Sequence, residues 1–175
     1  MKAFHTLVGL RHPVHQIGAA IRDRLPEIAS SLDDVETITT ISRDERCDGG
    51  MMLVNEWRVN PKLPSALNAV ITPDKLGWLD YADWDADLSQ CRWRIEPFFL
   101  ADAIRCEGTT RIIPAMGGRG ARATFEGTLV VDPDALSAVP LMWRKSATTA
   151  VEMLVGTLIP KNFRKTTDAI TALLG

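Results

Sequence analysis

Asn55 is the clearest polar side chain that the sequence places among apolar ones. It lies between Leu53 and Trp57 at alternate positions of a strand-like run, so the three side chains share one face. A buried amide without a hydrogen-bond partner costs roughly 1 to 3 kcal/mol, and we therefore expect a water, a backbone group or a ligand to satisfy it. Thr110 and Cys106 occupy comparable positions and are weaker candidates of the same kind.

Asp80 is the second candidate for chemistry, because Trp78 and Tyr81 flank it closely in the sequence. A carboxylate at the mouth of an aromatic cavity would have a raised pKa and could act as a general acid or base. The alternative is a solvated strand end. Acidic residues blur the alternation over 77–86, so the pattern does not assign an inner face there.

Other familiar catalytic or metal-binding patterns are missing. His5, His12 and His15 are the only histidines, and His12 with His15 has no third ligand nearby, so helix capping or surface exposure is expected and no metal site. No nucleophile, base and acid can be grouped by spacing alone. The glycines of 117–120 fall between two strands rather than before a helix, which predicts a hairpin turn and not a phosphate-binding loop.

Composition excludes several classes of protein. The net charge of -2, with no basic tract, argues against nucleic acid or an anionic membrane as a partner. Cys47, Cys91 and Cys106 are widely spaced and odd in number, which favours reduced thiols in a cytoplasmic protein. Residues 1–10 are too short and polar for a signal peptide, and no apolar run predicts a membrane span. We expect one domain over 1–175, without a cofactor and without stable membrane insertion.

The run from Met51 to Asp132 predicts the sheet that must position these side chains. Apolar and charged residues alternate through four strand-like runs within it, as in an antiparallel sheet with one wet face. The charged face carries Arg and Glu residues that can pair across strands, and a solvated surface is its simplest interpretation. The fold class is therefore α+β, with about six or seven antiparallel strands.

Helices are expected before and after this run along the chain. Residues 2–8 predict a first strand, and a short helix pair follows, with Pro13 in its first turn and Pro26 at the break. The tail from Leu141 to Leu174 has apolar residues at helical spacing. Pro160 should kink this helix or split it in two. Residues 65–71 could add one or two helical turns.

This order resembles the START-like, or SRPBCC, superfamily, which includes polyketide cyclases, lipid-transfer START domains and the birch-pollen allergen family. The resemblance rests on the opening strand Phe4-His5-Thr6-Leu7-Val8, the His12-Pro13 start of the helix, the hairpin Asp48-Gly49-Gly50 and the terminal helix after Asp132-Pro133. It implies a helix-grip fold, in which a curved sheet wraps around the C-terminal helix. It also implies a cavity for a hydrophobic or amphipathic small molecule.

Side-chain size along the expected inner face varies from tryptophan to glycine. The small residues leave room either for close approach of the C-terminal helix or for a ligand pocket. The tryptophans could stack on a flat ligand or fill core volume. The residues expected to bound a ligand cavity are Asn55, Trp57, Trp93, Ile95, Cys106, Gly108, Thr110, Ala123, Phe125, Val151 and Leu154.

Three functions follow as hypotheses. The leading one is binding of a lipid-like or polyketide-like small molecule in the cavity. The second is a cyclase or aromatase activity, in which Asn55, Asp80 or Thr110 assists proton transfer. The third is an interaction module, a homodimer through an edge strand or through residues 61–71, which would expose an apolar patch rather than a deep pocket.

Overall fold

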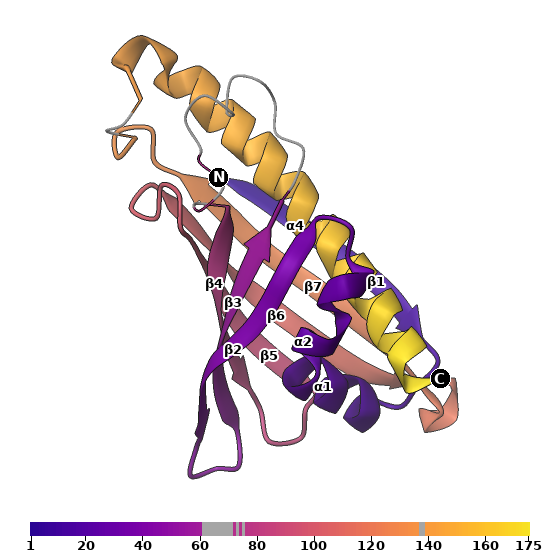
Figure 1. The fold of residues 1–175 in the computed structure, drawn as a ribbon. Helices are drawn as coiled ribbons and strands as arrows, with labels where there is room; N and C mark the ends of the chain where they lie inside the picture. Colours follow the sequence, from indigo (N-terminus) through magenta and orange to yellow (C-terminus); the bar gives the residue numbers. More distant parts are fainter. Residues whose placement is uncertain (61–71, 73, 75, 137–138) are drawn as a thin grey trace.

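A computed structural model describes residues 1–60, 72, 74, 76–136 and 139–175. Seven antiparallel strands form one curved sheet in the order β1-β7-β6-β5-β4-β3-β2 (Figure 1). The strands are β1 (Lys2–Leu10), β2 (Val35–Glu45), β3 (Met51–Val59), β4 (Gly77–Trp84), β5 (Gln90–Pro97), β6 (Ile104–Ala115) and β7 (Gly120–Val131). The predicted antiparallel sheet is confirmed.

The inner face of the sheet follows the alternation expected from the sequence. In β3 the odd positions from Met51 to Val59 are buried and the even positions are not. The register carries this parity across the sheet, because a cross-strand partner points to the same side. Asn55 pairs with Asp80, and Asp80 pairs in turn with Ile95. The even residues of β4, which the sequence pattern left unassigned, therefore face inward.

The opposite face of the sheet carries charges, as predicted. Arg92 lies 3.1 Å from Asp83, and Arg111 lies 2.9 Å from Glu126, in ion pairs whose members are all more than a quarter exposed. Exposed pairs of this kind contribute only about 0 to 1 kcal/mol each. They keep the outer face solvated without adding much stability.

Glycines make both predicted turns. Gly49 has φ of 82°, a conformation that favours glycine, and the Gly50 amide donates to Asp48 Oδ1 at 2.9 Å between β2 and β3. Between β6 and β7, Gly117 and Gly118 have φ of 64° and 85°. This second turn connects two strands and precedes no helix, as expected.

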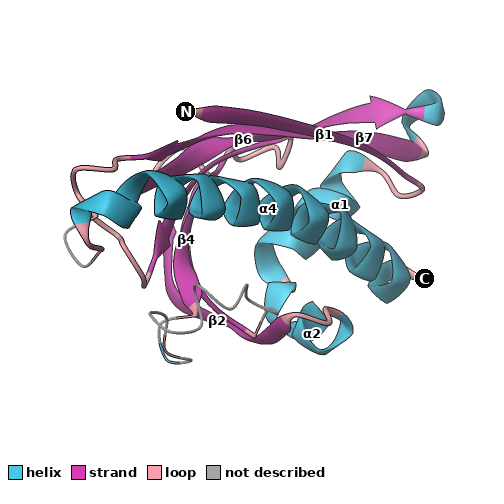
Figure 2. Ribbon diagram, turned by 90° about the horizontal axis from the view of Figure 1, so that it is seen from above, coloured by secondary structure: helices cyan, strands magenta, loops and turns pink. Residues whose placement is uncertain are grey.

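In the described part of the chain, three α-helices cover the concave side of the sheet (Figure 2). They are α1 (Val14–Asp23), α2 (Leu25–Ile28) and α4 (Arg144–Leu174). Figure 2 shows α4 running across the sheet, with α1 and α2 beside its C-terminal part. The buried Ile17 of α1, Ile28 of α2 and Ile170 of α4 belong to the same core. The predicted helix pair and the long C-terminal helix are thus confirmed.

Of the two outcomes expected for Pro160, a split of the C-terminal helix is wrong, and a kink stays a prediction. Helix α4 is one helix of 31 residues, with Pro160 inside it. Contacts on both sides hold it, because Val151 is buried before Pro160 and Phe163 stacks on Phe125 of β7 after it. Packing against the sheet offsets the backbone hydrogen bond that a proline cannot donate. The predicted helical turns at 65–71 lie outside the described residues.

None of the described helices is long and apolar enough to span a bilayer. Strands β1 and β2 form the two edges of the sheet. Self-association through one of these edges stays a prediction, and the alternative interface at 61–71 lies outside the described residues.

Candidate ligand-binding site

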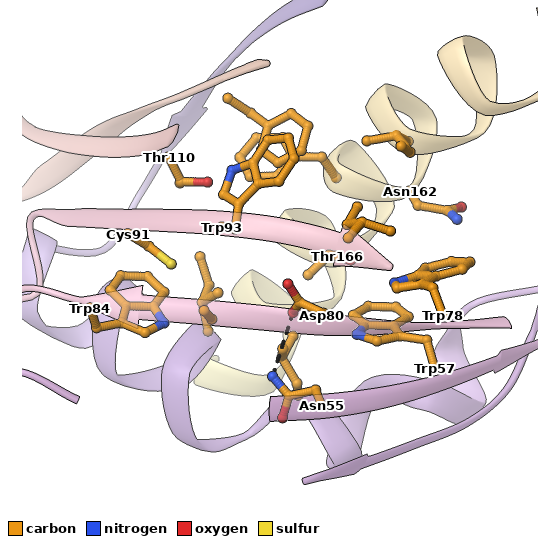
Figure 3. A pocket seen from close by; sticks show the side chains of 17 residues that line it. Asn55, Trp57, Trp78, Asp80, Trp84, Cys91, Trp93, Thr110, Asn162 and Thr166 are labelled. Carbon is orange, nitrogen blue, oxygen red and sulfur yellow. Dashed lines mark hydrogen bonds between the residues drawn. The ribbon is translucent and has the colours of Figure 1, made fainter. Parts of the chain in front are cut away.

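A cavity of about 120 Å³ lies between the sheet and helix α4. Most of its surface is apolar, and its walls come from β3, β4, β5, β6, β7 and the three helices. Figure 3 shows the side chains that surround it. The lining residues are Ile21, Leu25, Asn55, Trp57, Trp78, Asp80, Ala82, Trp84, Cys91, Trp93, Ile95, Thr110, Phe125, Ile159, Asn162, Phe163 and Thr166.

Asp80 and Asn55 form the polar centre of the sheet wall. The Asn55 side chain donates from Nδ2 to Asp80 Oδ2 at 3.5 Å, and Figure 3 shows this contact as a dashed line. On its other side, Asn55 Oδ1 accepts a hydrogen bond of 2.8 Å from the Thr40 hydroxyl. Because the hydroxyl occupies the oxygen, the amide is oriented with its N–H groups toward the carboxylate. Side chains therefore satisfy Asn55, where a water, a backbone group or a ligand was expected.

Burial changes the acidity of Asp80. Part of its surface stays exposed, and that part faces the cavity, while protein atoms enclose the carboxyl group elsewhere. Loss of hydration raises the pKa of Asp80 from 3.8 to about 6, against the opposing effects of the Asn55 amide and the Trp57 indole. Asp80 is thus poised to exchange a proton near neutral pH.

Two indole N–H groups are buried without a partner. Trp57 Nε1 and Trp93 Nε1 make no hydrogen bond within the described part of the chain. The Trp57 indole lies close enough to Asp80 to influence its pKa, yet outside hydrogen-bond geometry. Both tryptophans line the cavity, so each N–H is a donor that a bound molecule could satisfy.

Helix α4 adds polar groups that sequence reasoning missed. Asn162 and Thr166 are buried, line the cavity and form no side-chain hydrogen bond with any residue that the structure describes. They are four residues apart, so both fall on one side of the helix. The spacing of Asn162 and Thr166, next to Phe163, was the sequence signal that could have placed them at the cavity. Thr110, on β6, adds a second buried hydroxyl at the cavity.

An aromatic stack fills the space above the small residues of β6 and β7. The Trp93 and Phe125 rings stack at 4.6 Å between centroids, and Phe125 stacks on Phe163 of α4 at 4.5 Å. A Cβ added to Gly108 or to Gly127 would lie 2.5 Å from the Trp93 ring. These glycines therefore make room for an indole, an explanation that neither the helix-packing nor the ligand-pocket hypothesis had included.

The residues predicted to bound the cavity divide into two groups. Six of them line it, namely Asn55, Trp57, Trp93, Ile95, Thr110 and Phe125. Cys106, Gly108, Ala123 and Val151 lie on the inner faces of the sheet or helix but outside the lining. The side chain of Leu154 lies outside the described residues. Asp80, Trp78 and Trp84 join the lining through β4.

The cysteines are thiols of two kinds. Cys47 is exposed, whereas Cys91 and Cys106 are buried. Burial raises the pKa of Cys91 well above 9, with a smaller contribution from Asp80, and raises that of Cys106 to about 12. Cys91 therefore stays a neutral thiol in the cavity wall. Over the described residues, no three His, Cys, Asp or Glu side chains are arranged to hold a metal ion.

Comparison with known proteins identifies solved structures that share this fold. No family model matches the chain, and no curated protein matches it in sequence. Several solved structures match nearly its whole length. TTHA0849 from Thermus thermophilus is 18% identical, with a TM-score of 0.62, over 98% of this chain and 95% of that one.

Two further structures are enzymes by name. The Zhui aromatase/cyclase from Streptomyces sp. R1128 is 13% identical, with a TM-score of 0.63, over 98% of this chain and 92% of the other. Norcoclaurine synthase from Thalictrum flavum in complex with dopamine and hydroxybenzaldehyde is 16% identical, with a TM-score of 0.58, over 99% and 86%. The chain therefore has the helix-grip fold, as its resemblance to START-like proteins implied.

Proposed function

We propose that this protein binds a small aromatic molecule in the cavity between the sheet and α4. The observation that carries the proposal is the lining itself, in which apolar and aromatic walls surround a few convergent polar groups. This is the usual composition of a small-molecule site. Packing alone would have favoured an apolar side chain at Asp80, since an enclosed carboxylate destabilises the folded state.

The size of the cavity favours a compact ligand. An apolar cavity of about 150 Å³ in another protein holds benzene. At about 120 Å³, the space described here suits a molecule built on a single ring better than a long lipid or polyketide chain. The dopamine and hydroxybenzaldehyde bound by the Thalictrum enzyme are molecules of this class.

A cavity-filling variant tests this proposal. Ala82 lines the cavity in β4, and Ala82→Leu directs three more carbon atoms into it. Phenethyl alcohol should quench or shift the tryptophan fluorescence of the wild-type protein in a saturable way, and Ala82→Leu should weaken that binding. Thr109→Leu, on the outer face of β6, is the matched control and should bind like wild type. Equal binding by Ala82→Leu would place the probe elsewhere and contradict the proposal.

A second candidate function is acid–base catalysis on the bound molecule. The specific observation in its favour is Asp80, whose pKa of about 6 lies near the value at which a carboxyl group transfers protons efficiently at neutral pH. The aromatase/cyclase neighbours make ring closure the reaction to assay first. If the protein turns over a substrate, Asp80→Asn should abolish turnover while binding persists. Unchanged turnover in that variant would remove Asp80 from the mechanism.

A further inference from the structure

The described lining of the cavity contains an acidic side chain and no basic one. Among the described lining residues, Asp80 is the one side chain that can carry a charge at neutral pH, because Cys91 remains a neutral thiol. No Arg, Lys or His belongs to that lining. Asp80 takes part in no ion pair with any residue that the structure describes. Among the residues that the structure describes, an ionised Asp80 therefore faces the cavity without a compensating cation.

Two carboxylates that follow Asp80 closely in the sequence, unlike Asp80, have arginine partners. Asp83, on the outer face of β4, lies 2.6 Å from Arg46 and 3.1 Å from Arg92. Asp85 lies 3.2 Å from Arg92. The protein thus provides guanidinium partners for carboxylates that water already stabilises. Within the described residues, the enclosed Asp80 has only the neutral Asn55 amide and Trp57 indole beside its carboxyl group, although an unpaired buried charge is the costlier case.

We infer that the bound molecule is an aromatic amine whose protonated nitrogen pairs with Asp80 while its ring lies against the tryptophans of the cavity. This inference rests on the proposed function and names the class of ligand. An ammonium group supplies the missing positive charge and donates a charge-assisted hydrogen bond to the carboxylate. Aromatic side chains favour the same ligand, because ring faces attract cations.

The surroundings of Asp80 define how pH should act on binding. Asn55 of β3 and Ile95 of β5 are its cross-strand partners, Trp57 and Cys91 lie close enough to interact with it, and Thr166 of α4 lines the same cavity. None of these groups changes charge near neutral pH. Affinity for an amine should therefore rise as Asp80 ionises and stay high while the amine remains protonated. A ligand that accepts a proton or hydrogen bond from neutral Asp80 would show the opposite trend.

A matched pair of probes tests the inference. Phenethylamine and phenethyl alcohol have the same number of heavy atoms and differ in charge. By calorimetry at about pH 8, wild type should bind the amine at least about tenfold more tightly than the alcohol. Asp80→Asn, which keeps the shape of the side chain, should remove that difference. Ala82→Leu should weaken the binding of both probes and preserve the ratio of their dissociation constants.

The outcomes separate the inference from the proposed function. Equal or tighter binding of the alcohol by wild type, or amine affinity that falls as pH rises through about 6, overturns the inference and leaves aromatic binding intact. Absence of binding for both probes overturns the inference together with the proposed function. Asp80→Asn must unfold with the cooperativity of wild type. Should it fail to fold, the pH dependence of the wild-type amine affinity decides the question alone.

Discussion

Asn55 and Asp80 are direct cross-strand partners, and the Asn55 amide donates to the Asp80 carboxylate over 3.5 Å. Thr40 fixes the direction of that donation by occupying the amide oxygen at 2.8 Å. An amide that presents N–H groups favours the ionised carboxylate. The arrangement therefore limits the rise in pKa that burial imposes on Asp80.

Replacement of Asn55 should shift the titration of Asp80. Asn55→Leu keeps a side chain of similar size and removes the donor, so the pKa of Asp80 should rise above its wild-type value of about 6. Carbon-detected NMR of the Asp80 carboxyl group measures this directly. Thr40→Val is the control from the exposed side of the pair, and it should shift the titration in the same direction by a smaller amount. A fall in the pKa would contradict the role assigned to Asn55.

Asp80→Asn should make the protein more stable at high pH. The pKa of Asp80 is higher in the folded state than its ordinary 3.8, so the folded protein binds the proton more tightly. The resulting penalty is absent below about pH 4, grows as pH rises and reaches about 3 kcal/mol above about pH 6. Urea unfolding at about pH 8 should show much of this gain in the variant, and the gain should vanish toward about pH 4. A variant less stable than wild type at high pH would mean that Asp80 is stabilised by a partner.

Gly108→Ala should destabilise the fold through Trp93. The new methyl carbon would lie 2.5 Å from the indole ring and would also press on the Glu126 backbone. Overpacking of a core typically costs about 1 to 3 kcal/mol. Gly9→Ala in β1 is the matched control, because a Cβ there meets nothing within 4 Å. Thermal unfolding should separate the two variants clearly. Equal midpoints would show that Trp93 moves aside without cost.

Thiol labelling should distinguish Cys47 from the other two cysteines. Cys47 is exposed, while burial keeps the pKa of Cys91 and of Cys106 far above neutral pH, so both lack the reactive thiolate. An aromatic disulfide reagent should titrate one thiol in the native protein and three in urea. Rapid reaction of a second thiol in the native state would show that the cavity wall opens.

The sheet could be predicted because its strands repeat a simple pattern. Met51 to Val59 alternates so regularly that the amino-acid sequence alone reveals its inner face, and Asn55 follows from that face. Asp80 could not be placed in the same way, since acidic residues on both faces of β4 obscure the period. Its cross-strand pairing with Asn55 shows that Asp80 faces the inside of the sheet. That pairing depends on how two strands align, which the sequence of β4 alone does not reveal.

The far wall of the cavity depends on packing that no single segment encodes. Asn162 and Thr166 share a helix face, but only docking of α4 brings that face to the cavity. Gly108 suggested empty space in the sequence, whereas the structure fills it with the ring of Trp93 from the next strand. The effect of Pro160 was overestimated for the same reason, because contacts with the sheet hold the helix through it.

Direct location of a bound aromatic molecule tests the central claim most sharply. Crystals of the protein soaked with para-bromophenol would reveal the ligand by the anomalous signal of bromine. The proposed function predicts one strong peak enclosed by Trp57, Trp93 and Phe125, which is lost in Ala82→Leu. Bromine found only on the outer surface, such as the hollow beside His5 and Thr128, would contradict it.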